Sequence, residues 1–390
     1  MTDSYCRIAF AQLSVNPAYL DESGISYLHE PVFPNQEREG LFTVSGIEEI
    51  TRLRNKIAGA YVTHISSKIE SIASFAADQG ANLLVLPEYS IPSEILESIK
   101  VLSDKMQVVI VAGSHIATHH SMKSYEKVGL GIGEESIGRA ICPIFVPGNA
   151  PQFCQKQQRS KWESSLIPGS PSRPISLVLG TQKVILQVSI CLDAISEPPP
   201  PVSRATKKKS VPVLIAMPSL SPKVDLFCDK ARLLLAAGMA TVFVNIAEFG
   251  GSRVFATTEH TSCWRVGRDG SEPLQKLSEA VVIIELDPSA QYEVRGSTAE
   301  HFPVRGVETY PLLYDNASAH AREYVDLLDE LKHKPPSSIS DLAARASRFT
   351  VVEERSFPLL LQDKIKHEAY PFRSSNHYIL WSGSAATSRA

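Results

Sequence analysis

The segment Val184-Ile-Leu-Gln-Val-Ser-Ile-Cys-Leu-Asp-Ala194 decides the fold prediction. Its first seven residues are mostly apolar and β-branched, which predicts a buried strand that ends at Cys191. A free cysteine in such a place usually only packs, because its side chain behaves as a small hydrophobe. A catalytic role for Cys191 therefore requires partner residues from other parts of the chain.

Two other predicted segments also end at charged residues. Residues 81–89 place Glu88 directly after an apolar run and a proline, and residues 151–156 end at Lys156. Taken singly, Glu88 could cap the next helix and Lys156 could lie in solvent, where these residue types are usually found. Taken together with Cys191, they supply a carboxylate, an amine and a thiol, each at the end of its own segment.

The order Glu88, Lys156, Cys191 resembles the catalytic triad of the nitrilase or carbon–nitrogen hydrolase superfamily. Residues 156–169 resemble that family's block of lysine, distal glutamate and Pro-Gly, and residues 231–252 its helix, its strand ending in asparagine and its glycine turn. The resemblance covers about residues 7 to 286. It implies an α/β fold, a four-layer α-β-β-α sandwich, and hydrolysis of a carbon–nitrogen bond other than a peptide bond.

The chain departs from the family pattern in two places. The family often has Tyr-x-Lys at the lysine, whereas here the aromatic residue is Phe153, which stands three residues before Lys156. After the cysteine, Ile195 and Glu197-Pro198 replace the usual arginine and Pro-Glu. The family's typical substrates are therefore not carried over to this chain.

The resemblance implies a role for each member of the triad. A thiol attacks only as a thiolate, so Cys191 needs a base, and Glu88 is the candidate because burial raises a carboxyl pKa toward neutrality. Lys156 and the backbone N–H of Leu192 would stabilise the oxyanion of a tetrahedral intermediate. An amide would then pass through a thioester that water hydrolyses, and a nitrile through a thioimidate. An amide is the preferred small-molecule substrate.

Further site residues are expected around this triad. Glu163 resembles the family's second glutamate, Asn245 is expected to support the site, and Asp193 is expected to be structural. No metal and no cofactor is expected. The residues expected to shape the substrate pocket are Tyr89, His115, Trp162 and Phe249.

Composition limits the other function classes. The 390 residues are 43% apolar and 21% charged, enough for one large domain with an extension. A formal net charge of −3 gives no basic surface for nucleic acid or for a membrane, and no apolar run approaches 18 residues. Six cysteines without a C-x-x-C pair and no visible signal peptide predict a cytoplasmic protein with free thiols.

The domain prediction is a carbon–nitrogen hydrolase domain over residues 5–308, with an inserted segment at 16–43 that could form a lid, and an extension over 309–390. The extension is expected to wrap its own domain or to contact a second subunit in a homodimer, with docking of another protein as the alternative. The elements predicted within this layout include helices at 46–79, 91–104, 225–238, 317–333 and 340–347, a hairpin over 125–146, and strands at 107–112, 213–217, 241–246 and 281–286, of which 281–286 is the last strand of the core.

Four other functions compete with the thiol hydrolase. His115, His119 and His120 could suggest a metal hydrolase, but their segment is typical of a polar loop and has no acidic or cysteine ligands. A catalytically silent binding or regulatory module would keep the fold only. A soluble acyltransferase would pass the acyl group to an amine instead of water. A glutaminase subunit would need a partner domain, and the chain has no phosphate-binding glycine motif.

Overall fold

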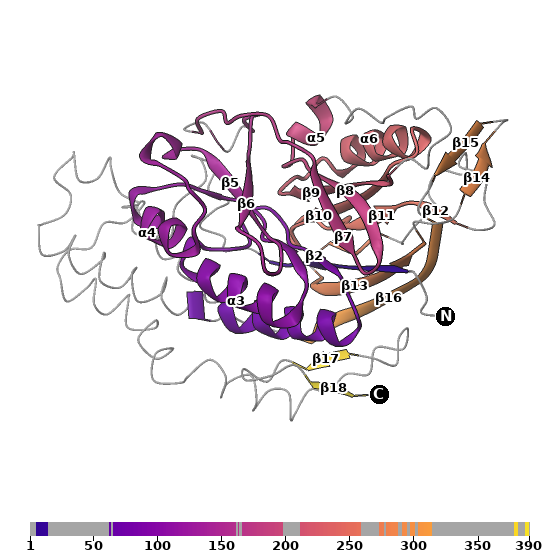
Figure 1. Cartoon of the computed structure of the whole chain (residues 1–390), viewed down its shortest axis with the longest axis horizontal. Helices are drawn as coiled ribbons and strands as arrows, with labels where there is room; N and C mark the ends of the chain where they lie inside the picture. The colour runs from indigo at the N-terminus through magenta and orange to yellow at the C-terminus, as the bar shows by residue number, and fades with distance from the viewer. Residues whose placement is uncertain are drawn as a thin grey trace, which may run out of the picture.

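Two β-sheets lie face to face, with helices on both outer sides (Figure 1). The computed structural model describes residues 5–14, 62–63, 65–160, 163, 166–197, 211–258, 273–276, 278–287, 291–294, 297–300, 303–313, 378–380 and 387–389. The expected α-β-β-α sandwich is confirmed. The expected insertion at 16–43, the helix before residue 62 and the tail helices at 317–333 and 340–347 lie outside the described residues.

The first sheet has parallel strands at its centre. Its order is β18-β17-β16-β13-β1-β2-β3-β5-β4, with β6 beside β5 and β12 beside β16. Strands β1, β2 and β3 run parallel, so the residues that follow β2 and β3 emerge at one edge of the sheet. The strands are β1 (Cys6–Gln12), β2 (Leu83–Val85), β3 (Val109–Val111), β4 (His115–Ile116), β5 (Ala140–Phe145), β6 (Gln152–Gln155), β12 (Thr257–Thr258), β13 (Ala280–Leu286), β16 (Pro303–Leu313), β17 (Tyr378–Leu380) and β18 (Thr387–Arg389).

The second sheet repeats this arrangement with the order β11-β10-β9-β8-β7. Strands β8, β9 and β10 are parallel, so the residues after each of them share one edge. Its strands are β7 (Ile175–Leu179), β8 (Gln182–Val188), β9 (Val213–Ser219), β10 (Ala240–Asn245) and β11 (Arg253–Phe255). A separate hairpin pairs β14 (Gln291–Val294) with β15 (Ser297–Glu300).

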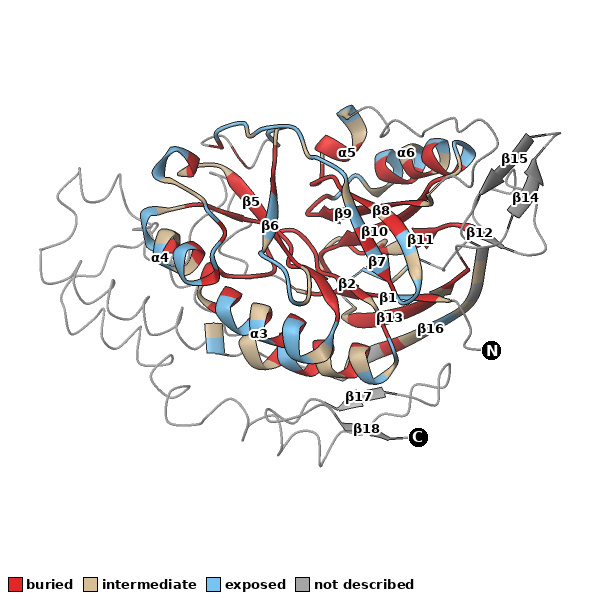
Figure 2. Cartoon of the chain, viewed as in Figure 1, coloured by how far each residue is buried: buried red, intermediate tan, exposed pale blue. Residues whose placement is uncertain are grey.

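Helices bury apolar faces against the two sheets and expose their other faces (Figure 2). A helix over residues 65–78 and α3 (Leu96–Met106) cover the first sheet, with α4 (His119–Val128) beside them. Helix α6 (Val224–Ala236) covers the second sheet, where the Phe227 and Phe243 rings lie 5.1 Å apart. The short helices are η2 (Ser93–Ile95), η3 (Glu134–Ser136) and α5 (Asp193–Ser196). No helix among the described residues is long and apolar enough to cross a membrane.

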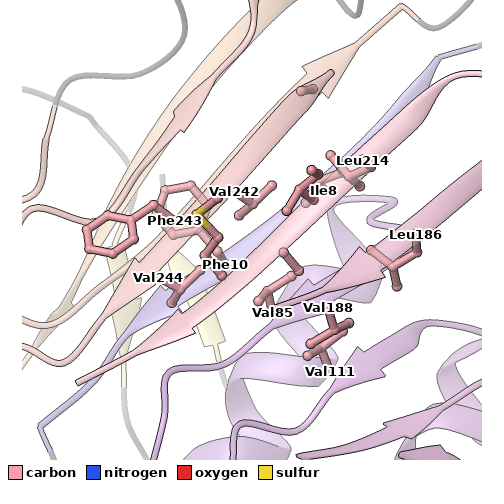
Figure 3. Packing of buried hydrophobic residues seen from close by; sticks show 14 of the residues in the cluster. Ile8, Phe10, Val85, Val111, Leu186, Val188, Leu214, Val242, Phe243 and Val244 are labelled. Atoms are coloured by element: carbon pink, nitrogen blue, oxygen red, sulfur yellow. The ribbon is translucent and has the colours of Figure 1, made fainter. Parts of the chain in front are cut away.

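Alternation along the strands divides the core into two layers. On β1, Ile8 and Phe10 point between the sheets, whereas Ala9 and Ala11 face the helices. The inter-sheet layer also contains Val188 from the second sheet (Figure 3). Each large aliphatic side chain buried there contributes roughly 1.5–3 kcal/mol relative to exposure. This packing fixes one sheet against the other and so places their edges.

The hairpin predicted over residues 125–146 is wrong, because its one strand, β5, pairs with β3, β4 and β6, which lie outside this range. The loop predicted at His119 and His120 is also wrong. Both histidines start helix α4, which continues through Val128. Thr118 caps it, because its hydroxyl accepts from the Ser121 N–H while the Ser121 hydroxyl accepts from the Thr118 N–H. A serine in the place of the usual glutamate hides this capping box in the sequence.

Several strands have no counterpart in the sequence prediction, and β7 and β16 are the two that change the sheets most. Strand β7 forms a hairpin with β8, and β16 pairs with β13, so Ala280–Leu286 is not the last strand of the first sheet. Strand β16 crosses position 308, the expected end of the hydrolase domain. The division into a domain over residues 5–308 and an extension over 309–390 stays a prediction.

Candidate active site

The edges of the two sheets bring Glu88, Lys156 and Cys191 together. Glu88 follows β2, Lys156 follows β6, and Cys191 follows β8. Each residue therefore leaves its own strand end, as the sequence predicts. Glu88 and Lys156 come from the first sheet and Cys191 from the second, so the site lies on the seam between the sheets.

Lys156 is held between two buried carboxylates. Its Nζ lies 2.7 Å from Glu88 Oε1, and 2.7 Å from both carboxylate oxygens of Glu163. The side chains of Lys156, Glu88 and Glu163 are 1%, 1% and 0% exposed, respectively. Buried charges are tolerated only when they are paired and hydrogen-bonded, and here the ammonium uses its donors on carboxylates.

Tyr89 belongs to the same network. Its hydroxyl donates to Glu163 Oε1 over 2.5 Å, and the Ser160 N–H donates to Glu163 Oε2 over 2.8 Å. The Tyr89 backbone has a φ of 58°, a left-handed conformation that is costly for a residue with a side chain. The sequence predicts that Tyr89 shapes the substrate pocket, and the structure places its hydroxyl against Glu163, beside the ammonium of Lys156.

Cys191 sits in a strained turn directly after β8. Its φ is 49°, and its N–H donates to the Pro218 carbonyl over 2.9 Å. The Sγ atom lies 3.7 Å from the carbonyl oxygen of Leu220. Non-glycine residues in left-handed conformations are concentrated at functional sites, where the surrounding structure enforces them.

The backbone of Leu220 connects the thiol to the carboxylate. The Leu220 N–H donates to Glu88 Oε2 over 2.8 Å, while its carbonyl accepts from Cys191 Sγ. Leu220 follows strand β9, which lies between β8 and β10. No sequence signal indicates this contact, since it is made by backbone atoms that nearly every residue possesses.

Burial and charge set the protonation states of the site. Burial, opposed by the nearby Lys156, raises the pKa of Glu88 to about 7. Burial and the carboxylate of Glu88 raise the pKa of Cys191 well above its ordinary value, so the resting group is the thiol. Burial disfavours the charged form of Lys156, but the carboxylates outweigh it and raise its pKa. Burial also opposes ionisation of Glu163, yet the ammonium of Lys156 lowers its pKa overall.

Asp193 joins the cysteine turn to the lysine segment. Its carboxylate accepts from the Gln157 N–H at 2.9 Å and from the Gln158 N–H at 2.7 Å. Glu197 adds a second link, since it accepts from the Ser189 hydroxyl and the Gln157 side chain, both over 2.6 Å. Burial, opposed by the two backbone N–H groups, raises the pKa of Asp193 to about 7.

The remaining expected site residues are placed as follows. No hydrogen bond within the described residues uses the backbone N–H of Leu192, which follows Cys191 directly. Asn245 is fully buried at the end of β10. His115 is buried and stacked on Tyr125, with ring centroids 5.5 Å apart, and burial lowers its pKa to about 4. Phe249 packs against the helix-side core. Trp162 lies outside the described residues.

The described residues contain no group of three His, Cys, Asp or Glu side chains that could hold a metal ion. Of the three histidines considered for a metal site, His115 stacks on an aromatic ring and His120 pairs with Glu94 at 3.1 Å.

No protein-family model and no curated protein matches the chain. Solved structures do match it. An amidase double mutant from Nesterenkonia sp. AN1 in complex with acrylamide is 17% identical, and the match covers 74% of this chain and 92% of that chain with a TM-score of 0.40. Nit3 from Saccharomyces cerevisiae is 15% identical, with 74% and 93% covered and a TM-score of 0.39. Both are nitrilase-superfamily proteins. This chain is similar to them in fold.

Proposed function

We propose that the protein is a thiol hydrolase that cleaves the carbon–nitrogen bond of a small amide, with Cys191 as nucleophile. The observation that supports this most strongly is the surroundings of Glu88. This one buried carboxylate contacts the Lys156 ammonium directly and is joined to the Cys191 thiol through the Leu220 backbone. A base whose pKa is raised to about 7 suits proton exchange with a thiol near neutral pH.

In the first half of the reaction, Cys191 Sγ attacks the amide carbon and its proton passes to Glu88. The oxygen that becomes negative is stabilised by the Lys156 ammonium and by the Leu192 N–H. Collapse of this intermediate breaks the carbon–nitrogen bond, and the departing amine takes the proton from Glu88. The products at this stage are the free amine and a thioester on Cys191.

In the second half, water attacks the thioester carbon and gives a proton to Glu88. Breakage of the carbon–sulfur bond releases the carboxylic acid, and the proton held by Glu88 returns to the sulfur of Cys191. Glu163 and Tyr89 hold the ammonium of Lys156 throughout, because Glu163 binds Nζ with both oxygens while Tyr89 binds Glu163. After each turnover Cys191 is again a thiol and Glu88 is again a carboxylate.

The test incubates the protein with a panel of short primary amides and measures hydrolysis by the release of ammonia. We expect Cys191→Ala to abolish turnover and the wild-type protein to show an acyl adduct on Cys191 by mass spectrometry. The matched control is Cys142→Ala, since Cys142 is an equally buried thiol on β5 outside this site. Full turnover in Cys191→Ala would refute the proposal. An adduct that is released only on addition of an amine would indicate acyl transfer in place of hydrolysis.

A further inference from the structure

We propose that Asn245 is a positioning residue that orients the Leu220–Ser221 peptide group toward Cys191. The inference rests on the proposed function, because it explains how the thiol and its base are held. Asn245 touches none of the reacting groups in the described contacts. It acts on them by holding the peptide group between Leu220 and Ser221. Further hydrogen bonds connect Asn245 to Gln12 of the first sheet.

The side-chain amide of Asn245 uses both its oxygen and its nitrogen in hydrogen bonds. Oδ1 accepts from the Ser221 N–H over 3.0 Å, while Nδ2 donates to the Ser221 carbonyl and to the Gly250 carbonyl, both over 2.8 Å. One acceptor facing a donor and one amide nitrogen facing two carbonyls define the orientation of the side chain. Neither aspartate nor leucine, which are similar in size, could make this set of bonds.

The Ser221 N–H and the Leu220 carbonyl belong to the same peptide group. That group is planar, so holding its N–H fixes the direction of its carbonyl. The Leu220 carbonyl is the atom that lies 3.7 Å from Cys191 Sγ. The N–H of Leu220 itself donates to Glu88 Oε2 over 2.8 Å. Asn245 therefore holds the backbone of residues 220–221. The Leu220 carbonyl in this segment contacts the nucleophile, and the Leu220 N–H contacts the base.

Asn245 is itself linked to the first sheet through Ser252. Its N–H donates to the Ser252 hydroxyl over 2.8 Å, and that hydroxyl donates to Gln12 Oε1 over 2.7 Å. Gln12 lies at the end of β1, and its Nε2 donates to the carbonyls of Gln275 and Ser278, both over 2.8 Å. Asn245, Ser252 and Gln12 are fully buried. This chain of hydrogen bonds links the sheet that carries Cys191 to the sheet that carries Glu88.

The glycine turn completes the support. Gly250 has a φ of 67°, and a Cβ there would lie 2.6 Å from the Lys276 backbone nitrogen. A residue with a side chain would therefore both strain the turn and push it away from the 273–276 segment. The close approach allows the Gly250 carbonyl to accept from Asn245 Nδ2.

The experiment follows alkylation of Cys191 by iodoacetamide across pH, read at this site by peptide mass spectrometry, and needs no known substrate. Three variants remove hydrogen bonds around Asn245. They are Asn245→Ala, Asn245→Asp, which keeps the side-chain volume, and Ser252→Ala. Thr241→Val is the matched control, because Thr241 is a fully buried residue of β10 whose hydroxyl has no hydrogen-bond partner within the described residues. Glu88→Gln reports on the base directly.

We expect the pH midpoint of Cys191 alkylation to move by about half a pH unit or more in the Asn245 variants, and by less in Ser252→Ala, while Thr241→Val keeps the wild-type profile. If Asn245→Ala does not fold, Asn245→Asp and Ser252→Ala provide the test. Wild-type profiles in the folded Asn245 and Ser252 variants, with a changed profile in Glu88→Gln, would overturn this inference and leave the proposed function standing. An unchanged profile in Glu88→Gln would instead remove the proposed function.

Discussion

At the scale of single residues, Lys156 determines the charge balance of the site, because it neutralises two carboxylates that are out of contact with water. Replacing it with methionine keeps the volume and leaves both carboxylates unpaired. We expect Lys156→Met to lower the free energy of unfolding by roughly 3–5 kcal/mol at neutral pH, and by less in acid, where a bound proton replaces the ammonium. Amide turnover should fall by about 10²–10³-fold through loss of oxyanion stabilisation.

Urea unfolding at two pH values measures the stability part of this prediction. Lys183→Met is the control, because Lys183 is an exposed lysine on β8 and its replacement should change stability by less than about 0.5 kcal/mol. Equal stability losses for Lys156→Met at neutral and acid pH would contradict the account, since unpaired buried carboxylates must respond to protons.

Glu88 makes a second residue-level prediction through its pKa, which burial raises from 4.5 to about 7. The folded protein then binds this proton more tightly than the unfolded chain. The resulting stabilisation is complete below pH 4.5 and is lost as the pH rises through about 7. Glu88→Gln removes this dependence, so its stability relative to wild type should increase steadily across that pH range. A stability difference that stays constant would show that Glu88 titrates at its ordinary pKa.

Asp193 is expected to act on the site through the backbone that follows Lys156. Asn at this position offers one acceptor oxygen where the carboxylate uses two on the N–H groups of Gln157 and Gln158. We expect Asp193→Asn to lower the free energy of unfolding by about 1–3 kcal/mol and to slow amide turnover. Asp78→Asn, at an exposed position, should have an effect below about 0.5 kcal/mol. Wild-type stability in Asp193→Asn would refute this link.

At the scale of elements, the loop after β3 packs against the loop after β2, and this contact fixes the position of Glu88. Gly113 has a φ of 64°, and a Cβ there would lie 2.1 Å from the Pro87 carbonyl oxygen, next to Glu88. Gly129 has a φ of 74°, but a Cβ there would meet no atom of the described residues within 4 Å. Gly129→Ala should therefore cost only the conformational strain, about 1–2 kcal/mol. Gly113→Ala should cost about 1–3 kcal/mol more, because backbone must also move.

Thermal or urea unfolding of the two glycine variants checks this pair, and amide turnover adds a second measure. We expect Gly113→Ala to reduce turnover, since the displaced Pro87 carries Glu88 with it, whereas Gly129→Ala should keep the wild-type rate. Equal stabilities and equal rates in both variants would mean that the two loops are not in close contact.

The strand ends could be predicted well from the sequence, and the links between them could not. Apolar runs that stop shortly before Glu88 and Cys191 are local signals, and the segment around Lys156 resembles a block of a known family, so the three elements could be identified without the fold. The Leu220 contact joins residues that are 29 and 132 positions apart and uses only backbone atoms on the Leu220 side, so no pattern of residue types indicates it. Helix α4 could not be predicted because its capping box has serine in the usual glutamate position.

At the scale of the whole molecule, the candidate site depends on how the two sheets are packed. One sheet supplies Glu88 and Lys156, and the other supplies Cys191 and Leu220. The α-β-β-α arrangement could be predicted because the strand and helix segments alternate and resemble those of a known family. The pairing of β16 with β13 could not, since β16 lies beyond the part of the chain that carries the resemblance.

The reactivity of the six cysteines tests the central claim most directly. Each site is followed by peptide mass spectrometry during alkylation with iodoacetamide, across pH, in wild type and in Glu88→Gln. The account predicts that Cys191, although only 1% exposed, reacts faster than the buried Cys6 and Cys142, with a rate that rises through about pH 7 as Glu88 loses its proton, and that Glu88→Gln removes this rise. A Cys191 as inert as Cys6 and Cys142 would contradict the account and leave the thiol as a packing residue.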